Sequence, residues 1–476
     1  MKRAISLAVF SLLAATTAGA ADLMSVYRDA LANDPTIRQA DAIRKATQQV
    51  KPESWAALLP QITGQGTYTR GSTENRQPNP TFDPITKQFI GLGVFAQDSN
   101  PKNRVWSLNL TQNLFSWTNW ATIRMADSQV AQAEADYRTA QQALLQKVAQ
   151  RYFNVLAAQD TLEAQQVALE AFNRQLDQAN KRFEVGLIAI TDVQDSKAAR
   201  DRSNADVIDA KRALATAEDQ LREVTSQSYD RLSRPGAEMP LAAPTPADEQ
   251  EWVNMALDQN TQLLSSRLAS DIARENVRIA FGGHLPQVDL VGTYGKGHNE
   301  GSATINGTTY DPYPSSNNTK TYGLQVQVPI FSGGRTNARV KEQEYRWIAA
   351  KEAVTASSRA TERAARDAYL GVISEMARVE ALKQAVDSSQ TSLKATEAGY
   401  EVGTRTSVDV LDQRRQLVAN QTTYLQSRYV YLTNVVNLKL AAGTLDEKTL
   451  DELNRLLTEA VTAAPTAPNS PNTPAR

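Results

Sequence analysis

The stretches RFEVGLIAITDVQD at Arg182–Asp195 and GYEVGTRTSVDVLD at Gly399–Asp412 write a similar glycine-centred segment twice, about 217 residues apart. Each lies in a long region without proline. Residues 102–234 contain a single glycine, Gly186, and residues 330–464 are rich in helix formers. Glycine suits the backbone conformation that ends a helix, so each segment is predicted to separate two helices. The four predicted helices are 117–185, 191–225, 333–402 and 407–442.

A seven-residue apolar repeat runs along the first helix of each predicted pair. A sustained heptad spacing favours helices that wind around neighbours with a left-handed twist. At 1.5 Å per residue, a helix over 117–185 is on the order of 100 Å long and needs lateral neighbours throughout. The repeat consists of Val148, Val155, Leu162, Leu169, Leu176 and Phe183 in the first half, and of Ala365, Val372, Val379, Val386, Leu393 and Tyr400 in the second.

Segments that alternate apolar and uncharged polar residues precede the long helices. Alternation over about ten residues is typical of membrane β-strands that line a wet lumen, and it equally fits a half-buried soluble sheet. The intervening residues 71–103 and 297–320 are rich in Asn, Gly, Pro and Thr, which predicts surface loops. The four predicted strands are about 61–69, 105–115, 287–296 and 321–331.

The order of elements repeats along the chain, which indicates an internal duplication. The first repeat covers 21–226 and the second covers 248–443. The proline-rich stretch 227–247 is a predicted linker in the equatorial region, and 444–462 is a predicted short helical belt segment. Residues 463–476 contain four prolines and are predicted to be disordered. Four strands cannot close a membrane barrel and open edges cannot face lipid, so membrane strands would require several chains to share one barrel.

Composition excludes several classes of function. Residues 1–20 combine a basic start, an apolar run and small residues before Ala21, which predicts a signal peptide. Removing Lys2 and Arg3 changes the formal charge from −1 to −3, so no nucleic-acid partner is predicted. The chain has no cysteine and only two histidines, which argues against disulfides, a metal site and a lipid-modified cysteine. No catalytic or cofactor-binding motif is present, so the protein is not predicted to be an enzyme.

The chain resembles the TolC family of bacterial outer-membrane channel-tunnels over nearly its whole length after the predicted signal peptide. The matching motifs are Leu58-Leu59-Pro60-Gln61, Val185-Gly186-Leu187 with Ile190-Thr191-Asp192-Val193, His284-Leu285-Pro286, and most specifically GYEVGTRTSVDVLD at 399–412. The similarity is to the branch that serves type I secretion and multidrug efflux.

The resemblance implies an α+β membrane protein that forms a homotrimer in the outer membrane of a Gram-negative bacterium. Four strands per chain would form a twelve-stranded β-barrel, continued by a long twelve-helix periplasmic α-barrel with a mixed equatorial belt. The implied function is the exit duct of tripartite efflux pumps and type I secretion systems. The implied partners are a periplasmic adaptor, an inner-membrane pump and outer-membrane lipid, and the cargo is either small compounds or secreted proteins.

The resemblance also assigns roles at the two turns. It implies that Arg405 binds Asp192 and Thr191, and that Tyr400 also reaches Asp192, so that the periplasmic mouth stays closed. Iris-like movement of the helix ends would then open the mouth. The turns that dock the adaptor would be Val185, Gly186 and Leu187 with Val402, Gly403 and Thr404.

Acidic residues follow each turn. Asp409 and Asp412 are three residues apart and share a helix face. In a trimer they would form two rings of carboxylates at the entrance, and Asp195, at the position equivalent to Asp412, would make it more acidic. The alternative is that Asp192 and Asp409 only stabilise helix N-termini. The alternative for the whole chain is a soluble periplasmic coiled-coil adaptor or scaffold protein.

Overall fold

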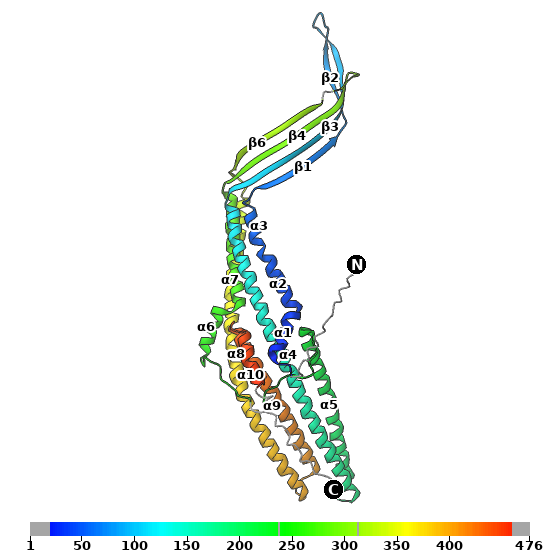
Figure 1. Cartoon of the computed structure of the whole chain (residues 1–476), viewed down its shortest axis with the longest axis vertical. Coiled ribbons are helices and arrows are strands. Elements are labelled where there is room, and N and C mark those ends of the chain that lie inside the picture. Colours follow the sequence, from blue (N-terminus) through cyan, green and yellow to red (C-terminus); the bar gives the residue numbers. More distant parts are fainter. Residues whose placement is uncertain (1–19, 237–238, 312–313, 459–476) are drawn as a thin grey trace, which may run out of the picture. The chain divides into compact units, whose positions relative to one another are not determined.

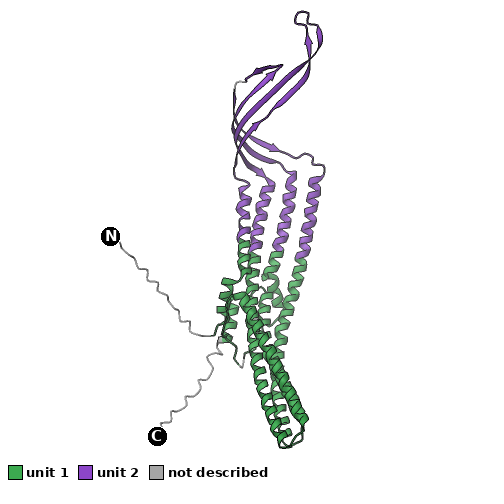
Figure 2. Ribbon diagram, turned by 90° about the vertical axis from the view of Figure 1, so that its right-hand side faces the viewer, with its two compact units in different colours: residues 1–44, 134–266, 354–476 green, residues 45–133, 267–353 purple. Residues whose placement is uncertain are grey.

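The computed structural model describes residues 20–236, 239–311 and 314–458. The chain divides into two compact units (Figure 2). Unit 1 comprises residues 1–44, 134–266 and 354–476, and unit 2 comprises residues 45–133 and 267–353. Within the described residues, none of the helices combines the length and the apolar character needed to cross a membrane. The predicted disordered tail and the predicted signal peptide, apart from Ala20, lie outside the described residues.

Unit 2 contains an antiparallel sheet whose four main strands lie side by side in the order β1, β3, β4, β6 (Figure 1). Strand β2 pairs with the outer part of β3, and the short strand β5 pairs with the end of β4. The strands are β1 (Gln61–Arg70), β2 (Thr73–Phe82), β3 (Phe89–Ser116), β4 (Gln287–Ile305), β5 (Thr308–Tyr310) and β6 (Ser315–Gln327).

The register gives the four main strands two chemically different faces. Residues that oppose one another across antiparallel strands lie on the same face of the sheet. One row across all four strands is uncharged and polar, and its Thr293 hydroxyl donates to Asn109 Oδ1 at 3.1 Å. The adjacent row, on the other face, is largely apolar. The polar row is Thr63, Asn109, Thr293 and Thr321, and the apolar row is Ile62, Leu110, Gly292 and Tyr322.

The predicted loops at 71–103 and 297–320 are wrong, because most of these residues form strands. Their backbone groups pair across hairpins. Asn306-Gly307 closes the short hairpin between β4 and β5 with positive φ at both residues, a type of turn that asparagine and glycine favour. Strand β2 contains Pro78 and Pro80, which lack the N–H group needed for further pairing at that edge. The predicted strand 321–331 also ends early, at Gln327, two residues before Pro329.

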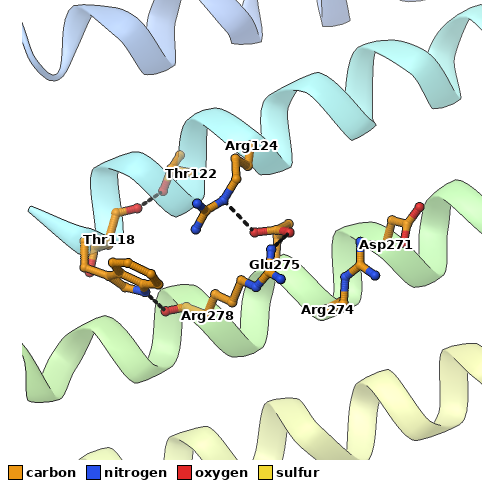
Figure 3. Close-up of polar contacts among 8 residues, drawn as sticks. Thr118, Thr122, Arg124, Asp271, Arg274, Glu275 and Arg278 are labelled. Carbon is orange, nitrogen blue, oxygen red and sulfur yellow. Dashed lines mark hydrogen bonds and ion pairs between the residues drawn. The ribbon is translucent and has the colours of Figure 1, made fainter.

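Helices of unit 2 adjoin the strands in sequence, and α4 begins directly after β3. Glu275 of α7 is about 4% exposed and forms ion pairs with Arg124 Nε of α4, at 3.3 Å, and with Arg278 (Figure 3). The Trp117 Nε1 donates to the carbonyl of Arg278 at 3.2 Å. These contacts hold α7 against the start of α4, because a buried carboxylate needs its cationic partners. The bounds are α3 (Val50–Ala56), α4 (Trp117–Glu184), α7 (Thr261–Phe281) and α8 (Arg335–Glu401).

Unit 1 has a continuous apolar core in which the middle of α4 packs against the middle of α8 and α9 and against shorter helices. The heptad residues Val148, Val155, Val372 and Val379 are at most 3% exposed, whereas Phe183, next to the first turn, is 42% exposed. The remaining helices are α1 (Leu23–Asn33), α2 (Pro35–Gln48), α5 (Ile190–Thr225), α6 (Glu249–Gln259), α9 (Ser407–Ala441) and α10 (Glu447–Thr458).

Candidate functional site

The two glycine turns have the same backbone geometry. Gly186 has φ +76° and Gly403 has φ +79°, values that residues with a side chain rarely adopt. In the first turn, the amide of Leu187 donates to the carbonyl of Arg182 at 2.9 Å. In the second, the amide of Thr404 donates to the carbonyl of Gly399 at 2.8 Å. These bonds close α4 and α8 with the same Schellman motif, so each long helix ends at its glycine.

Acidic residues cap the helices that leave the turns. At α9, Thr406 Oγ1 accepts from the Asp409 amide at 3.2 Å, and Asp409 Oδ2 accepts from the Thr406 amide at 2.9 Å. The pKa of Asp409 is lowered. The main cause is the hydrogen bond from the Thr406 amide, and the contact with the Thr406 hydroxyl and the positive charge of Arg405 lower the pKa further. At α5, Ala189 lacks a side-chain acceptor, so only the reverse bond forms, from the Ala189 amide to Asp192 Oδ2 at 3.3 Å. Both acids therefore have a structural role as helix caps.

A direct side-chain hydrogen bond joins the two hairpins. The hydroxyl of Ser407, the first residue of α9, donates to Asp192 Oδ1 in α5. Ser407 is 4% exposed. Phe172 of α4, Ala199 of α5 and Leu411 of α9 belong to one apolar cluster, and Ala199 and Leu411 lie within two helical turns of Asp192 and Ser407 respectively. Asp192 thus uses one oxygen to cap its own helix and the other to hold the neighbouring hairpin.

Arg405 belongs to the turn between α8 and α9, and its side chain lies against Gly399 near the end of α8. The absence of a side chain at Gly399 makes room for it, since a Cβ there would lie 2.8 Å from Arg405 Cγ. Within the described part of this single chain, no hydrogen bond or ion pair links the Arg405 side chain to Asp192 or Thr191. The proposed link of Arg405 therefore stays a prediction for the assembled protein. Thr191 is exposed.

Tyr400 does contact the other hairpin, through Arg182. The guanidinium carbon of Arg182 lies 4.8 Å from the centre of the Tyr400 ring. A cation above an aromatic ring at this distance is attractive, by about 0.5–1 kcal/mol at an exposed site. The predicted contact of Tyr400 with Asp192 likewise stays a prediction. Among the described residues, the Ser407–Asp192 hydrogen bond and the Arg182–Tyr400 contact join the two hairpins near the turns, and neither was predicted from the sequence.

The predicted entrance acids differ in their surroundings. Asp409 is half-buried and held by its cap. Asp412 is exposed and pairs with Arg415, whose Nη1 lies 3.0 Å from Oδ1. Asp195 is exposed on α5. A single chain presents these acids near its two turns, and their arrangement in rings stays a prediction.

The turns expose large apolar side chains. Val185, Leu187 and Val402 are 69%, 72% and 76% exposed in the single chain. Exposed apolar residues that gather at one place indicate an interaction site more often than isolated ones do. The predicted docking turns therefore have a surface suited to a protein partner.

A polar cluster around the buried Asp160 and Tyr429, farther along the helices, was also not predicted from the sequence. The hydroxyl of Tyr429 in α9 donates to Asp160 Oδ2 in α4 at 2.6 Å. Arg234 Nη1 lies 3.3 Å from Asp160 Oδ1 and 3.0 Å from Glu163 Oε2. Burial, then the neighbouring Asp160 carboxylate, raises the pKa of Tyr429. The cluster joins α4, α9 and the segment after α5.

Comparison with known proteins places these features in context. A family model described as outer membrane efflux protein matches residues 26–227 and 252–444. The chain is 33% identical over 458 residues to the outer membrane protein TolC of Vibrio cholerae, covering 95% of this chain and 98% of that protein. It is 36% identical to TolC of Escherichia coli K12, covering 94% and 87%. The solved outer-membrane channel OprN has a similar fold, with a TM-score of 0.71 at 16% identity, covering 89% and 90%.

Proposed function

The chain belongs to the outer membrane efflux protein family, and we propose that three copies form the exit duct of tripartite efflux pumps and type I secretion systems. It is an outer-membrane channel protein that passes substrates to the exterior. In the proposal, a periplasmic adaptor and an inner-membrane pump deliver these substrates. Transport through such a duct requires neither catalysis nor a cofactor. The alternative of a soluble adaptor is not favoured, since the relatives are outer membrane proteins.

The observation that supports a barrel shared by several chains is the four-stranded order β1, β3, β4, β6, and the number three is what the resemblance to the family implies. Among the described residues, β1 and β6 each pair on one side only, and unpaired strand edges cannot face lipid. Three chains would join β1 of one copy to β6 of the next and close a twelve-stranded barrel, with the apolar face toward lipid. The long helices would form the periplasmic α-barrel and supply each other's lateral neighbours.

The proposed gate is the set of contacts between the two turns. Asp192 would hold the second hairpin through Ser407, and in the trimer also through Arg405. Binding of the adaptor at the exposed turns, around Leu187 and Val402, would break these contacts and let the helix ends move apart. Conductance of the Arg405→Ser, Asp192→Ala double variant in planar bilayers tests this gate, and an unchanged conductance would count against it.

The proposed entrance rings consist of Asp409 and Asp412, with Asp195 adding charge. Crowded carboxylates attract cations, so the rings would favour cation passage and bind multivalent cations. The Asp409→Ala, Asp412→Ala double variant is expected to weaken block by multivalent cations. Equal block in the parent and the variant would remove the ring proposal.

The proposed function as a whole is tested by purification from outer membranes. We expect a trimer in detergent that migrates differently before and after heating and that conducts ions in planar bilayers. A protein that stays monomeric without detergent and carries no current would refute the proposal.

A further inference from the structure

One end of the sheet carries a concentration of basic side chains on a single face. In the outermost rows, Arg70 opposes Lys102, and Arg104 opposes His298. Lys296 lies opposite Trp106, one row farther in, and Lys320 lies opposite Tyr294. All of these residues share the face of the apolar row. We call Arg70, Lys102, Arg104, Lys296 and Lys320 the basic band.

The basic band lies at one end of the strands. The helices that precede and follow these strands in the sequence connect to the opposite end. Strand β1 follows α3 and ends at Arg70, whereas α4 begins immediately after the other end of β3. Along this face, apolar residues come first. Trp106 and Tyr294, whose rings are 5.5 Å apart, share their rows with Lys296 and Lys320, and the rows of Arg104, Arg70 and Lys102 follow. Aromatic side chains prefer the boundary between hydrocarbon and headgroups. The order therefore places the basic band at headgroup level.

The charges of the basic band are poorly balanced within the chain. Arg70 and Lys102 stand directly opposite each other, and like charges in this position destabilise a strand pair. In these rows of the described sheet, Glu300 is the only acid on this face. It stands directly opposite Lys102, and its Oε1 lies 2.8 Å from His298 Nε2. The next acids outward on this face, Asp98 and Glu74, stand directly opposite each other, and Asp98 forms an ion pair with Arg76. An external anion would offset the remaining positive charge.

The same face has a recess that can receive a headgroup. A cavity of about 660 Å³ is lined by Tyr68, Arg104, Trp106, Lys296 and His298, among others. The Arg104 guanidinium carbon lies 5.8 Å from the centre of the Tyr68 ring. Likewise, Lys320 Nζ lies 5.7 Å from the centre of the Tyr294 ring. A cation that contacts the face of an aromatic ring can still donate its N–H groups to an anion. Guanidinium and ammonium groups are the usual partners of phosphate oxygens.

We propose that the basic band binds the phosphate groups of a phosphorylated glycolipid in the outer leaflet. The proposal rests on the proposed position of the sheet in the outer membrane. The lipid chains would lie along the apolar row, while Arg70, Lys102 and Arg104 contact the phosphates. A free phosphate ion would use only the cations, whereas the glycolipid also uses the apolar and aromatic part of the same face. Each cation near a charged headgroup layer contributes about a fivefold gain in affinity.

The test measures glycolipid binding by purified trimers in detergent, using native mass spectrometry. The probes are a diphosphoryl glycolipid, the same glycolipid without phosphates, and sodium phosphate as competitor. The Lys102→Gln, Arg104→Gln double variant is expected to bind the diphosphoryl glycolipid about 25-fold more weakly than the parent. Lys197→Gln with Arg202→Gln in α5 removes the same charges from exposed positions elsewhere and is expected to bind as the parent does.

Three results would overturn the proposal: equal binding by the parent and the Lys102, Arg104 variant, equal binding of the dephosphorylated glycolipid, or complete displacement by millimolar phosphate. Oligomeric state and conductance are measured on the same samples. A parent protein that neither trimerises nor conducts would refute the proposed function itself. A conducting trimer without preference for the phosphorylated lipid would refute only the glycolipid site.

Discussion

Substituting Ser407 with alanine isolates one contact of the proposed gate. The substitution removes a buried hydroxyl that donates to Asp192 Oδ1, and it leaves the cap of α5 on the other oxygen of Asp192 in place. Hydrogen bonds to charged groups contribute roughly 1.5–3 kcal/mol. Because Asp192 is half-buried and water can replace the hydroxyl, we expect about 1–2 kcal/mol per protomer.

Three protomers that open together would lose about 3–6 kcal/mol of closed-state stability. A shift from 1:99 to 99:1 requires about 5.5 kcal/mol, so the open-to-closed ratio should rise by roughly 10²- to 10⁴-fold. Single-channel recording in planar bilayers measures this ratio directly. A double-mutant cycle with Asp192→Ala shows whether the two residues act through one another.

Ser203→Ala is the matched control for this experiment. Ser203 is also a buried serine on a long helix, 3% exposed, and its hydroxyl has no hydrogen-bond partner within the described chain. Its removal should leave the open-to-closed ratio unchanged. A Ser407→Ala variant that conducts as the parent does, while Asp192→Ala opens the channel, would refute the role of Ser407, because Asp192 would then hold the gate through another residue such as Arg405.

Three further substitutions test other parts of the structure. Gly403→Ala places a side chain at φ +79° and should destabilise the turn by roughly 1–2 kcal/mol, seen as faster limited proteolysis between α8 and α9. Tyr429→Phe removes one hydrogen bond from the buried carboxylate of Asp160 and should cost about 1–3 kcal/mol, measured by thermal unfolding against a parent sample. Burial and the nearby Glu447 carboxylate raise the pKa of Tyr27 to about 12, so the folded state holds this proton more tightly than the unfolded state does. Stability from Tyr27 is therefore fully present below pH 10 and lost between pH 10 and about 12, and unfolding of Tyr27→Phe should depend less on pH in this window.

Helix positions were largely predictable from the sequence, because proline and glycine mark their ends locally. The helix predicted at 117–185 is observed at Trp117–Glu184, and the one predicted at 407–442 is observed at Ser407–Ala441. The strands were less predictable. Residues 71–103 look like a loop by composition, yet they pair across a hairpin, and composition does not report pairing. The turn dipeptide Asn306-Gly307 was the available local signal for one hairpin.

The candidate site was predictable only where its geometry is local. The glycine turns and the acid at the third position of α9 follow from short-range patterns. The Ser407–Asp192 bond depends on how α9 packs beside α5, across 215 residues, and no local pattern specifies that register. The hydrogen bond between Tyr429 and Asp160 joins residues 269 positions apart. Each residue lies on a long predicted helix, and nothing in its local sequence indicates a buried polar partner.

Pro78 and Pro80 on β2 limit which strand edges of the chain can pair with another copy. A strand edge with missing donors cannot template the addition of another chain, whereas β1 and β6 retain theirs. In the proposed assembly, each chain would therefore join its neighbours through β1 and β6 rather than through β2. Each such joint would use one β1 edge and one β6 edge, so a closed ring would leave neither edge free and would be a finite particle rather than an open-ended fibre.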